Sequence, residues 1–185
     1  MRQIVLRQMA LPELQLLATI DRSEEIYDIY TWSEGRLQLI PQRESVNGFE
    51  PAELAALLQR QQQLLQDGGI VTGAFDGPIL AGICSVAYPP RGKAGDYRQM
   101  DILYVSRPYR GQGIAQQLVA AAAAQGSAFG ADRLYISATP TKGTVDFYLR
   151  AGAVPVRELD PELYRLEPED IYLELAIRRR ENYNF

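Results

Sequence analysis

A glycine-containing segment between a predicted strand and a predicted helix constrains this chain more than any other feature. The apolar pattern of residues 97–105 predicts a strand, and residues 111–129 have the composition of a long helix. Gly111 and Gly113 lie where that helix begins. The first turn of a helix has N–H groups without intrahelical partners, and glycines leave room for an anion against the backbone. The segment therefore predicts a site for a phosphate or diphosphate group.

Composition excludes several other kinds of chemistry. The 185 residues include no histidine, which excludes Ser-His-Asp and Cys-His nucleophilic sites, histidine zinc sites and a histidine base. Cys84 is the single cysteine, so an intrachain disulfide is excluded, and its apolar surroundings predict a buried hydrophobic residue. The net charge of -4 argues against a nucleic-acid partner. We expect no metal site.

Length and apolar content predict one domain over residues 1–185. No stretch approaches the roughly 20 apolar residues of a membrane span, and the first residues have too short an apolar run for a signal peptide. We therefore expect a cytoplasmic protein without a membrane partner. Arg178, Arg179 and Arg180 are expected to form a solvated tail.

The rest of the chain alternates predicted strands and helices. Further strands are predicted at residues 2–8, 70–75, 79–88, 133–137, 154–156 and 171–177, and further helices at 13–20, 51–66 and 144–150. Residues 24–41 predict a hairpin or an extended excursion, and the glutamine run of residues 59–63 predicts a solvated helix face. Because a crossover helix joins the strand at 97–105 to the strand at 133–137, these two strands should be parallel. The order predicts an α/β fold.

Three families use a glycine loop of this kind. The Walker loop requires a lysine and a serine or threonine after the glycines, and this chain lacks them. The Rossmann fingerprint requires a third glycine where this chain has Gln116, and an acid at the end of the next strand, whereas Asp132 precedes that strand. The pattern that fits is Arg110-x-x-Gly113-x-Ala115.

This pattern resembles the acetyl-CoA signature of the GNAT superfamily of N-acetyltransferases. The resemblance includes the apolar-Val pair, proline and aromatic residue of Leu103–Arg110, and the Phe-Tyr and glycine of Phe147–Gly152. It covers residues 70–155 well, whereas residues 22–48 have no counterpart in a minimal member and are expected to contribute to the acceptor site. The resemblance implies a mixed, mostly antiparallel central sheet with two splayed parallel strands and helices on both faces.

The resemblance also implies how acetyl-CoA would bind as co-substrate. Pantetheine would pair with strand backbone at Leu103, Tyr104 and Val105, and the Val105 N–H would polarise the thioester carbonyl. The diphosphate would be held by backbone amides of Arg110, Gly111, Gln112, Gly113, Ile114, Ala115 and Gln116.

Tyr148 matches the family tyrosine that lies near the thioester sulfur. Full proton transfer from a phenol to a thiolate is uphill by roughly 2 kcal/mol, so we expect Tyr148 to donate a stabilising hydrogen bond. A tyrosine that only packs on the core is the alternative. Thr141 stands where family members often have asparagine.

No motif identifies the general base, and a carboxylate acting directly or through water is the expected class. Asp101 is our candidate, with an ordinary salt-bridge residue as the alternative. Strand alternation predicts that it shares a face with Gln99 and Leu103. One branch of the family has its glutamate base at the position of Gln99, where a glutamine cannot act. The rival carboxylates are Glu24, Glu25 and Asp28, in a segment whose aromatic residues are expected either to line a pocket or to form a core.

The resemblance predicts an enzyme that transfers an acetyl group from acetyl-CoA directly to a small-molecule or peptide amine. Direct attack is expected because Cys84 is misplaced as a nucleophile and no activated serine is evident. Three alternatives stay open: another acyl-CoA donor, a non-catalytic acyl-CoA-binding module, and a nucleotide-binding domain. Family members often dimerise through their C-terminal strands, so a homodimer is also open.

Overall fold

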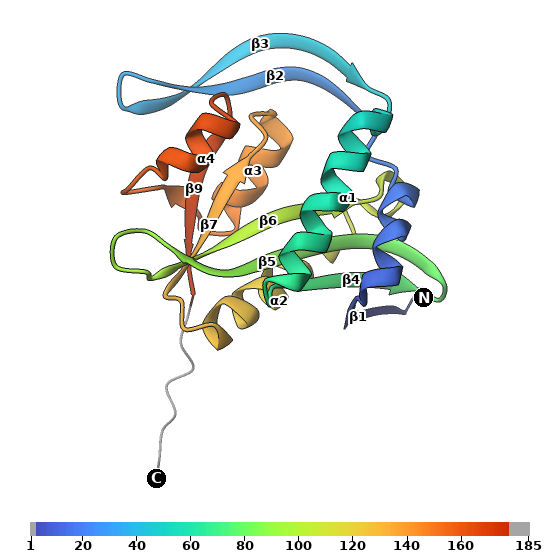
Figure 1. The fold of residues 1–185 in the computed structure, drawn as a ribbon. Coiled ribbons are helices and arrows are strands. Elements are labelled where there is room, and N and C mark those ends of the chain that lie inside the picture. Colours follow the sequence, from blue (N-terminus) through green and yellow to red (C-terminus); the bar gives the residue numbers. More distant parts are fainter. Residues whose placement is uncertain (1–2, 178–185) are drawn as a thin grey trace.

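The structure is a computed structural model that describes residues 3–177. Its main sheet has the strand order β1-β4-β5-β6-β7-β9-β8 (Figure 1). These strands are β1 (Ile4–Gln8), β4 (Ile70–Asp76), β5 (Ile79–Arg91), β6 (Tyr97–Val105), β7 (Arg133–Ala138), β8 (Val154–Pro155) and β9 (Ile171–Ala176). β6 and β7 are parallel and the other neighbouring pairs are antiparallel. The expected mixed, mostly antiparallel sheet is confirmed.

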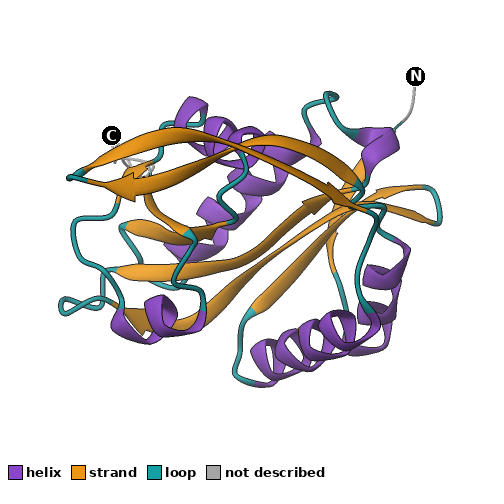
Figure 2. Cartoon of the chain, turned by 90° about the horizontal axis from the view of Figure 1, so that it is seen from above, coloured by secondary structure: helices purple, strands orange, loops and turns teal. Residues whose placement is uncertain are grey.

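Helices cover both faces of this sheet (Figure 2). One face, here called the front face, packs against the 3-10 helix η1 (Leu11–Thr19), α1 (Pro51–Gln66) and α4 (Pro161–Leu166). The opposite back face packs against α2 (Ile114–Ala128) and α3 (Lys142–Arg150). The apolar stripes of the helices and the alternating strand residues therefore form separate cores on the two faces.

The segment that has no counterpart in a minimal relative is a β-hairpin, β2 (Glu24–Ser33) and β3 (Arg36–Val46). Glu34 and Gly35 connect the strands with positive φ angles of 53° and 74°, the backbone twist that a two-residue hairpin turn requires. The hairpin crosses one end of the main sheet, where the Tyr30 N–H donates to the Pro140 carbonyl at 2.7 Å (Figure 1). The Tyr30 hydroxyl donates to Asp146 Oδ1 at 2.8 Å, so the hairpin is anchored beside α3.

A β-bulge in β6 changes the expected direction of its side chains. Ser85 pairs with Ile102 and Val86 pairs with Met100, so Asp101 is an extra residue without a partner in β5. The prediction that Asp101 and Leu103 share a face is wrong, because the bulge resets the alternation. Leu103 packs with the back core, whereas Asp101 contacts α1 on the front face.

Several boundaries differ from those predicted. The helix expected from Gly111 begins at Ile114, because Gly111 and Gly113 are left-handed, with φ angles of 73° and 79°. The short helix α4 was not predicted, and β5 continues to Arg91, three residues beyond the predicted end of this strand. The glutamine run is not a uniformly solvated face, because Gln61 is 0% exposed.

Within residues 3–177, no helix combines the length and hydropathy needed to cross a membrane. Arg178, Arg179 and Arg180, expected as a solvated tail, lie outside the described residues.

Candidate active site

The two parallel strands separate partway along their length. β6 and β7 pair from Tyr97 with Arg133 to Met100 with Ile136, yet β6 continues to Val105 and β7 to Ala138. The separation begins at the bulge of Asp101. We call the region where residues 101–105 and the end of β7 no longer pair the β6–β7 fork. Inside it, one edge of β6 is left without a neighbouring strand.

The register of β6 shows which backbone groups point into the fork. The Ser106 N–H donates to the Ala81 carbonyl at 2.9 Å, which makes this a hydrogen-bonded pair of the antiparallel ladder. Hydrogen-bonded pairs alternate with non-hydrogen-bonded pairs along the ladder, and Val105 and Leu103 belong to the second kind. They therefore direct their N–H and C=O groups away from β5 and into the fork. Tyr104 directs its backbone groups toward β5, so the structure differs from the predicted backbone contact at that residue.

The loop after β6 presents a run of amides without acceptors. Among residues 3–177, none accepts a hydrogen bond from the N–H groups of Gly111 to Gln116, and the first helical donor is Gln117 N, 3.2 Å from the Gly113 carbonyl oxygen. A Cβ atom added at Gly111 or Gly113 would meet no atom within 4 Å. These open amides at the positive end of α2 fit a diphosphate group.

Arg110 has a different place from the one predicted. Its N–H donates to the Arg107 carbonyl at 3.2 Å in η2 (Arg107–Tyr109), so this amide is already used. Its Nε donates to the Val105 carbonyl oxygen at 3.1 Å, and its Nη1 donates to the Ser23 carbonyl oxygen at 3.1 Å. Arg110 therefore braces the end of β6 against the base of the hairpin.

Tyr148 lies on α3 in the back core and is 5% exposed. Within residues 3–177, its hydroxyl forms no hydrogen bond that affects its titration. Burial raises the pKa of this hydroxyl, and the nearby Cys84 and Tyr104 raise it further. The group is therefore a protonated donor that is available to a ligand. Thr141, by contrast, caps α3 by accepting from the Thr144 N–H at 3.3 Å.

The thiol of Cys84 is not equipped to be a nucleophile. It is 1% exposed and lies 3.4 Å from the Leu118 carbonyl oxygen, to which it donates. Burial raises the pKa of this thiol to about 12, so the thiolate is disfavoured. The prediction of a buried hydrophobic cysteine is confirmed.

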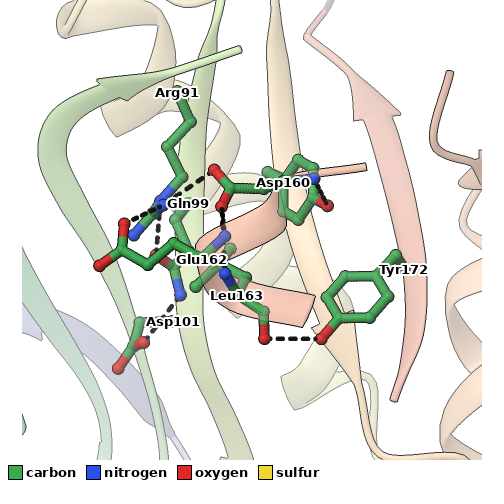
Figure 3. Close-up of polar contacts among 8 residues, drawn as sticks. Arg91, Gln99, Asp101, Asp160, Glu162, Leu163 and Tyr172 are labelled. Carbon is green, nitrogen blue, oxygen red and sulfur yellow. Dashed lines mark hydrogen bonds and ion pairs between the residues drawn. The ribbon is translucent and has the colours of Figure 1, made fainter. Parts of the chain in front are cut away.

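On the front face, Asp101 is the centre of a side-chain network. Its Oδ2 accepts from Arg60 Nε at 2.9 Å and from Gln61 Nε2 at 2.6 Å, and its Oδ1 accepts from Gln99 Nε2 at 3.0 Å. Gln99 Oε1 accepts in turn from Arg91 Nε at 2.9 Å, and Arg91 reaches α4 (Figure 3). The role of Asp101 as a base stays a prediction.

The rival carboxylates lie elsewhere. Glu24, Glu25 and Asp28 line a groove of 230 Å³ between β2 and the start of α3, which Tyr27, Thr141 and Lys142 also line. Tyr30 is committed to Asp146, and Trp32 is 54% exposed near the hairpin tip. The aromatic residues of the hairpin therefore do not share one role.

Three front-face residues were missed from the sequence. Arg60 and Gln61 lie in the glutamine run, and only their packing on the bulge shows that they contact Asp101. Asp170 immediately precedes β9, and Arg60, which donates to Asp101, also lowers the pKa of the Asp170 carboxyl. No local motif marks any of the three.

Comparison with known proteins decides the family. The model of the family described as "Acetyltransferase (GNAT) family" matches residues 24–153. The chain belongs to this family. No curated protein matches the acetyltransferase closely enough to count as a relative.

Solved structures share its fold. Nourseothricin acetyltransferase superposes with a TM-score of 0.71 at 17% identity, over 95% of this chain and 99% of that chain. A protein from Bacillus anthracis str. Ames, assigned as a streptothricin acetyltransferase and complexed with acetyl coenzyme A, gives 0.65 at 15% identity, over 96% and 99%.

A third neighbour is the PaiA N-acetyltransferase of Thermoplasma acidophilum in complex with coenzyme A. It gives a TM-score of 0.60 at 15% identity, over 94% of this chain and 99% of that chain. At these identities the likeness shows the fold alone. The coenzyme in two of the three structures fits acetyl-CoA as the expected co-substrate of this acetyltransferase.

Proposed function

We propose that this GNAT protein transfers an acetyl group from acetyl-CoA to a primary amine by direct attack. The observation that carries the proposal is the β6–β7 fork, whose strand backbone leads to the open amides of Gly111 to Gln116. Those amides would hold the diphosphate, and the fork-facing groups of Leu103 and Val105 would pair with pantetheine. The proposal places the activity in the cytoplasm and leaves a homodimer open.

The backbone of Val105 supports the chemistry. Its N–H points into the fork, and its carbonyl is fixed by Arg110 at 3.1 Å. A donor that is held rigidly before the reaction stabilises charge on the thioester oxygen without reorganising. We assign Arg110 a positioning role, because it holds this donor through the adjoining carbonyl.

Tyr148 supplies a hydrogen bond to the departing sulfur in this proposal. Within residues 3–177 its hydroxyl forms no hydrogen bond that affects its titration, and the residue lies in the same core as Leu103 and Val105. Because burial raises its pKa, complete proton transfer to a thiolate becomes more unfavourable than for a free phenol. Tyr148 therefore acts as a hydrogen-bond donor.

Direct attack is supported by the lack of a suitable nucleophile near the fork within residues 3–177. A covalent route needs an activated thiol or hydroxyl, and burial disfavours the Cys84 thiolate. The amine nitrogen would then attack the thioester carbon itself. A small-molecule or peptide amine is the acceptor class.

A binding and turnover panel tests the proposal. Thermal unfolding should shift upward with acetyl-CoA and CoA but not with ATP or NAD, and amines added with acetyl-CoA should release free thiol. Parallel reactions with succinyl-CoA and propionyl-CoA test donor choice. Stabilisation by ATP or NAD alone would favour the nucleotide-binding alternative. Tight CoA binding without turnover of any amine would favour a binding module.

A further inference from the structure

Two carboxylates face the fork from opposite strands on the front face. Asp101 comes from the bulge of β6, directly after the last paired residue, Met100. Asp170 immediately precedes β9, whose first residue Ile171 pairs with Ala138, the last residue of β7. Since strands rise about 3.3 Å per residue, Asp170 lies about 10 Å beyond the point where the strands separate. It is therefore at the open part of the fork. Ile171 packs in the back core and Tyr172 in the front core, so strand alternation places Asp170 on the front face, where Arg60 of α1 lowers the pKa of its carboxyl.

The two carboxylates differ in what already binds them. Asp101 accepts from three donors, those of Arg60, Gln61 and Gln99. The Asp170 side chain is half-buried, and it accepts no hydrogen bond from residues 3–177. A desolvated carboxylate without donors is costly unless a ligand supplies them. Asp170 is therefore the more available acceptor of a proton or an N–H group.

Another acceptor beside this space is also unfilled. Gln61 is 0% exposed, and its Nε2 is held by Asp101. Its Oε1 is buried with no partner among the described residues. Reversing the amide would place oxygen against the Asp101 carboxylate, so the network fixes this orientation. Two acceptors at the front of the fork, the Asp170 carboxylate and Gln61 Oε1, thus have no donor among residues 3–177, and an ammonium group would provide one to Asp170.

Resting on the proposed acetyl transfer, we propose that Asp170 is the catalytic base that binds the acceptor ammonium and removes its proton, directly or through one water. The proton moves from R–NH₃⁺ to the Asp170 carboxylate, and the freed nitrogen pair forms the C–N bond. The C–S bond breaks, sulfur leaves with the bonding pair and takes a proton, and one proton is released to water. The balance is R–NH₃⁺ and acetyl-CoA giving the amide, CoA–SH and H⁺.

The charged surroundings of Asp170 are suited to this task. Burial first and then the charge of Glu167 raise the pKa of its carboxyl, and Arg60 from α1 opposes them, so that the pKa is about 6. Tyr172 is the neighbouring titratable group on β9, and its hydroxyl donates to the Leu163 and Glu167 carbonyls. A base of this kind is largely ionised at neutral pH and is still strong enough to accept a proton.

The test compares Asp170→Asn with Asp170→Glu and Glu167→Gln, using the amine that gives the fastest thiol release in the panel. Asp170→Asn should lower kcat/KM for that amine about 100-fold. It should also remove the acidic limb of the pH profile, which is the fall in kcat/KM as the base becomes protonated at low pH. Asp170→Glu should retain the limb. Glu167→Gln should keep the activity and move the limb to lower pH, because a like charge beside Asp170 is gone. The affinity for acetyl-CoA, measured by calorimetry, should stay the same in all three.

The proposal is overturned if Asp170→Asn keeps both its rate within a few-fold and its acidic limb. It is also overturned if Asp101→Asn, and not Asp170→Asn, removes the limb while the protein still binds acetyl-CoA. Failure of the wild-type protein to release thiol with any amine is a different result, because it contradicts the proposed function itself.

Discussion

The two sides of the β6–β7 fork are made from different chemical groups. On the side that would bind the acetyl donor, here called the donor side, residues 103–116 present N–H and C=O groups of the main chain, and glycines keep them open. On the side that would bind the amine, here called the acceptor side, the polar groups are side chains from α1 and β6 in a network around Asp101, and Asp170 just before β9. The first is one continuous segment, whereas the second is assembled from segments far apart in the chain.

This difference has a consequence for specificity. A main-chain site depends on backbone shape, so many side chains can change around it without altering the ligand. A site of convergent side chains changes its ligand with single substitutions. We therefore expect the acetyl donor to be common to proteins of this fold and the amine acceptor to be particular to each. The following tests separate the two sides, beginning with the largest effect.

Removing the Tyr148 hydroxyl should slow acetyl transfer without affecting either binding side. We expect Tyr148→Phe to reduce kcat about 100-fold, because the departing sulfur loses a hydrogen bond that forms in the transition state. Tyr135→Phe is the control, since that tyrosine is equally buried but its hydroxyl accepts from the Asp160 N–H on the front face. Stopped-flow thiol detection would measure both. Equal rates in Tyr148→Phe and wild type would leave only a packing role.

Glycine substitution should weaken the donor side alone. Gly113 and Gly130 have similar φ angles, 79° and 81°, and both have open space where a Cβ would be added, so Ala imposes the same backbone strain. Only Gly113 adjoins the open amides. We predict ~10-fold weaker CoA binding by calorimetry for Gly113→Ala and wild-type affinity for Gly130→Ala. Equal losses would mean that strain, and not access to the amides, determines affinity.

Loosening the hairpin should affect the acceptor side. Tyr30→Phe removes the 2.8 Å hydrogen bond to Asp146, and we expect a loss of about 1 kcal/mol of unfolding free energy with a raised KM for the amine. The KM for acetyl-CoA should not change. Tyr27→Phe on the same strand is the control, because its ring is 58% exposed. An increase in the KM for acetyl-CoA instead would show that the two sides are coupled through the hairpin.

Acid should weaken the same anchor by a smaller amount. Lys142 first and then Tyr30 lower the pKa of the Asp146 carboxyl below its ordinary value of 3.8. Its contribution to stability is therefore fully present above pH 3.8 and is lost as the pH falls through the lower folded value. The difference in Tm between wild type and Asp146→Asn should shrink below pH 3.8. A difference that stays constant down to about pH 2 would contradict this assignment.

The donor side was largely predictable because its information is local. Gly111 and Gly113 lie beside a strand and a helix that sequence periodicity also predicts, and the structure places open amides there. The sequence did not reveal that the Arg110 N–H already donates to the Arg107 carbonyl, because this hydrogen bond depends on the 3-10 turn before it. The predicted backbone contact of Tyr104 failed for a similar reason. The hydrogen-bond register between β5 and β6 decides which backbone groups face the fork, and the sequence does not show it.

The acceptor side was hardly predictable because it depends on tertiary packing. The bulge at Asp101 has no signature in the sequence, and it reversed the expected relation to Leu103. Gln61 belongs to a run that looks solvated, yet the bulge buries it completely. Asp170 comes shortly after a proline and precedes an apolar strand, which is an ordinary loop pattern. Only the fold brings these residues together.

Amide hydrogen exchange on addition of acetyl-CoA tests the central claim most directly. The account predicts slower exchange at Gly111 to Gln116, Leu103 and Val105, with little change at Gly130 and in the paired part of β6 and β7. Protection confined to other segments, with the amides of Gly111 to Gln116 exchanging as fast as before, would contradict it.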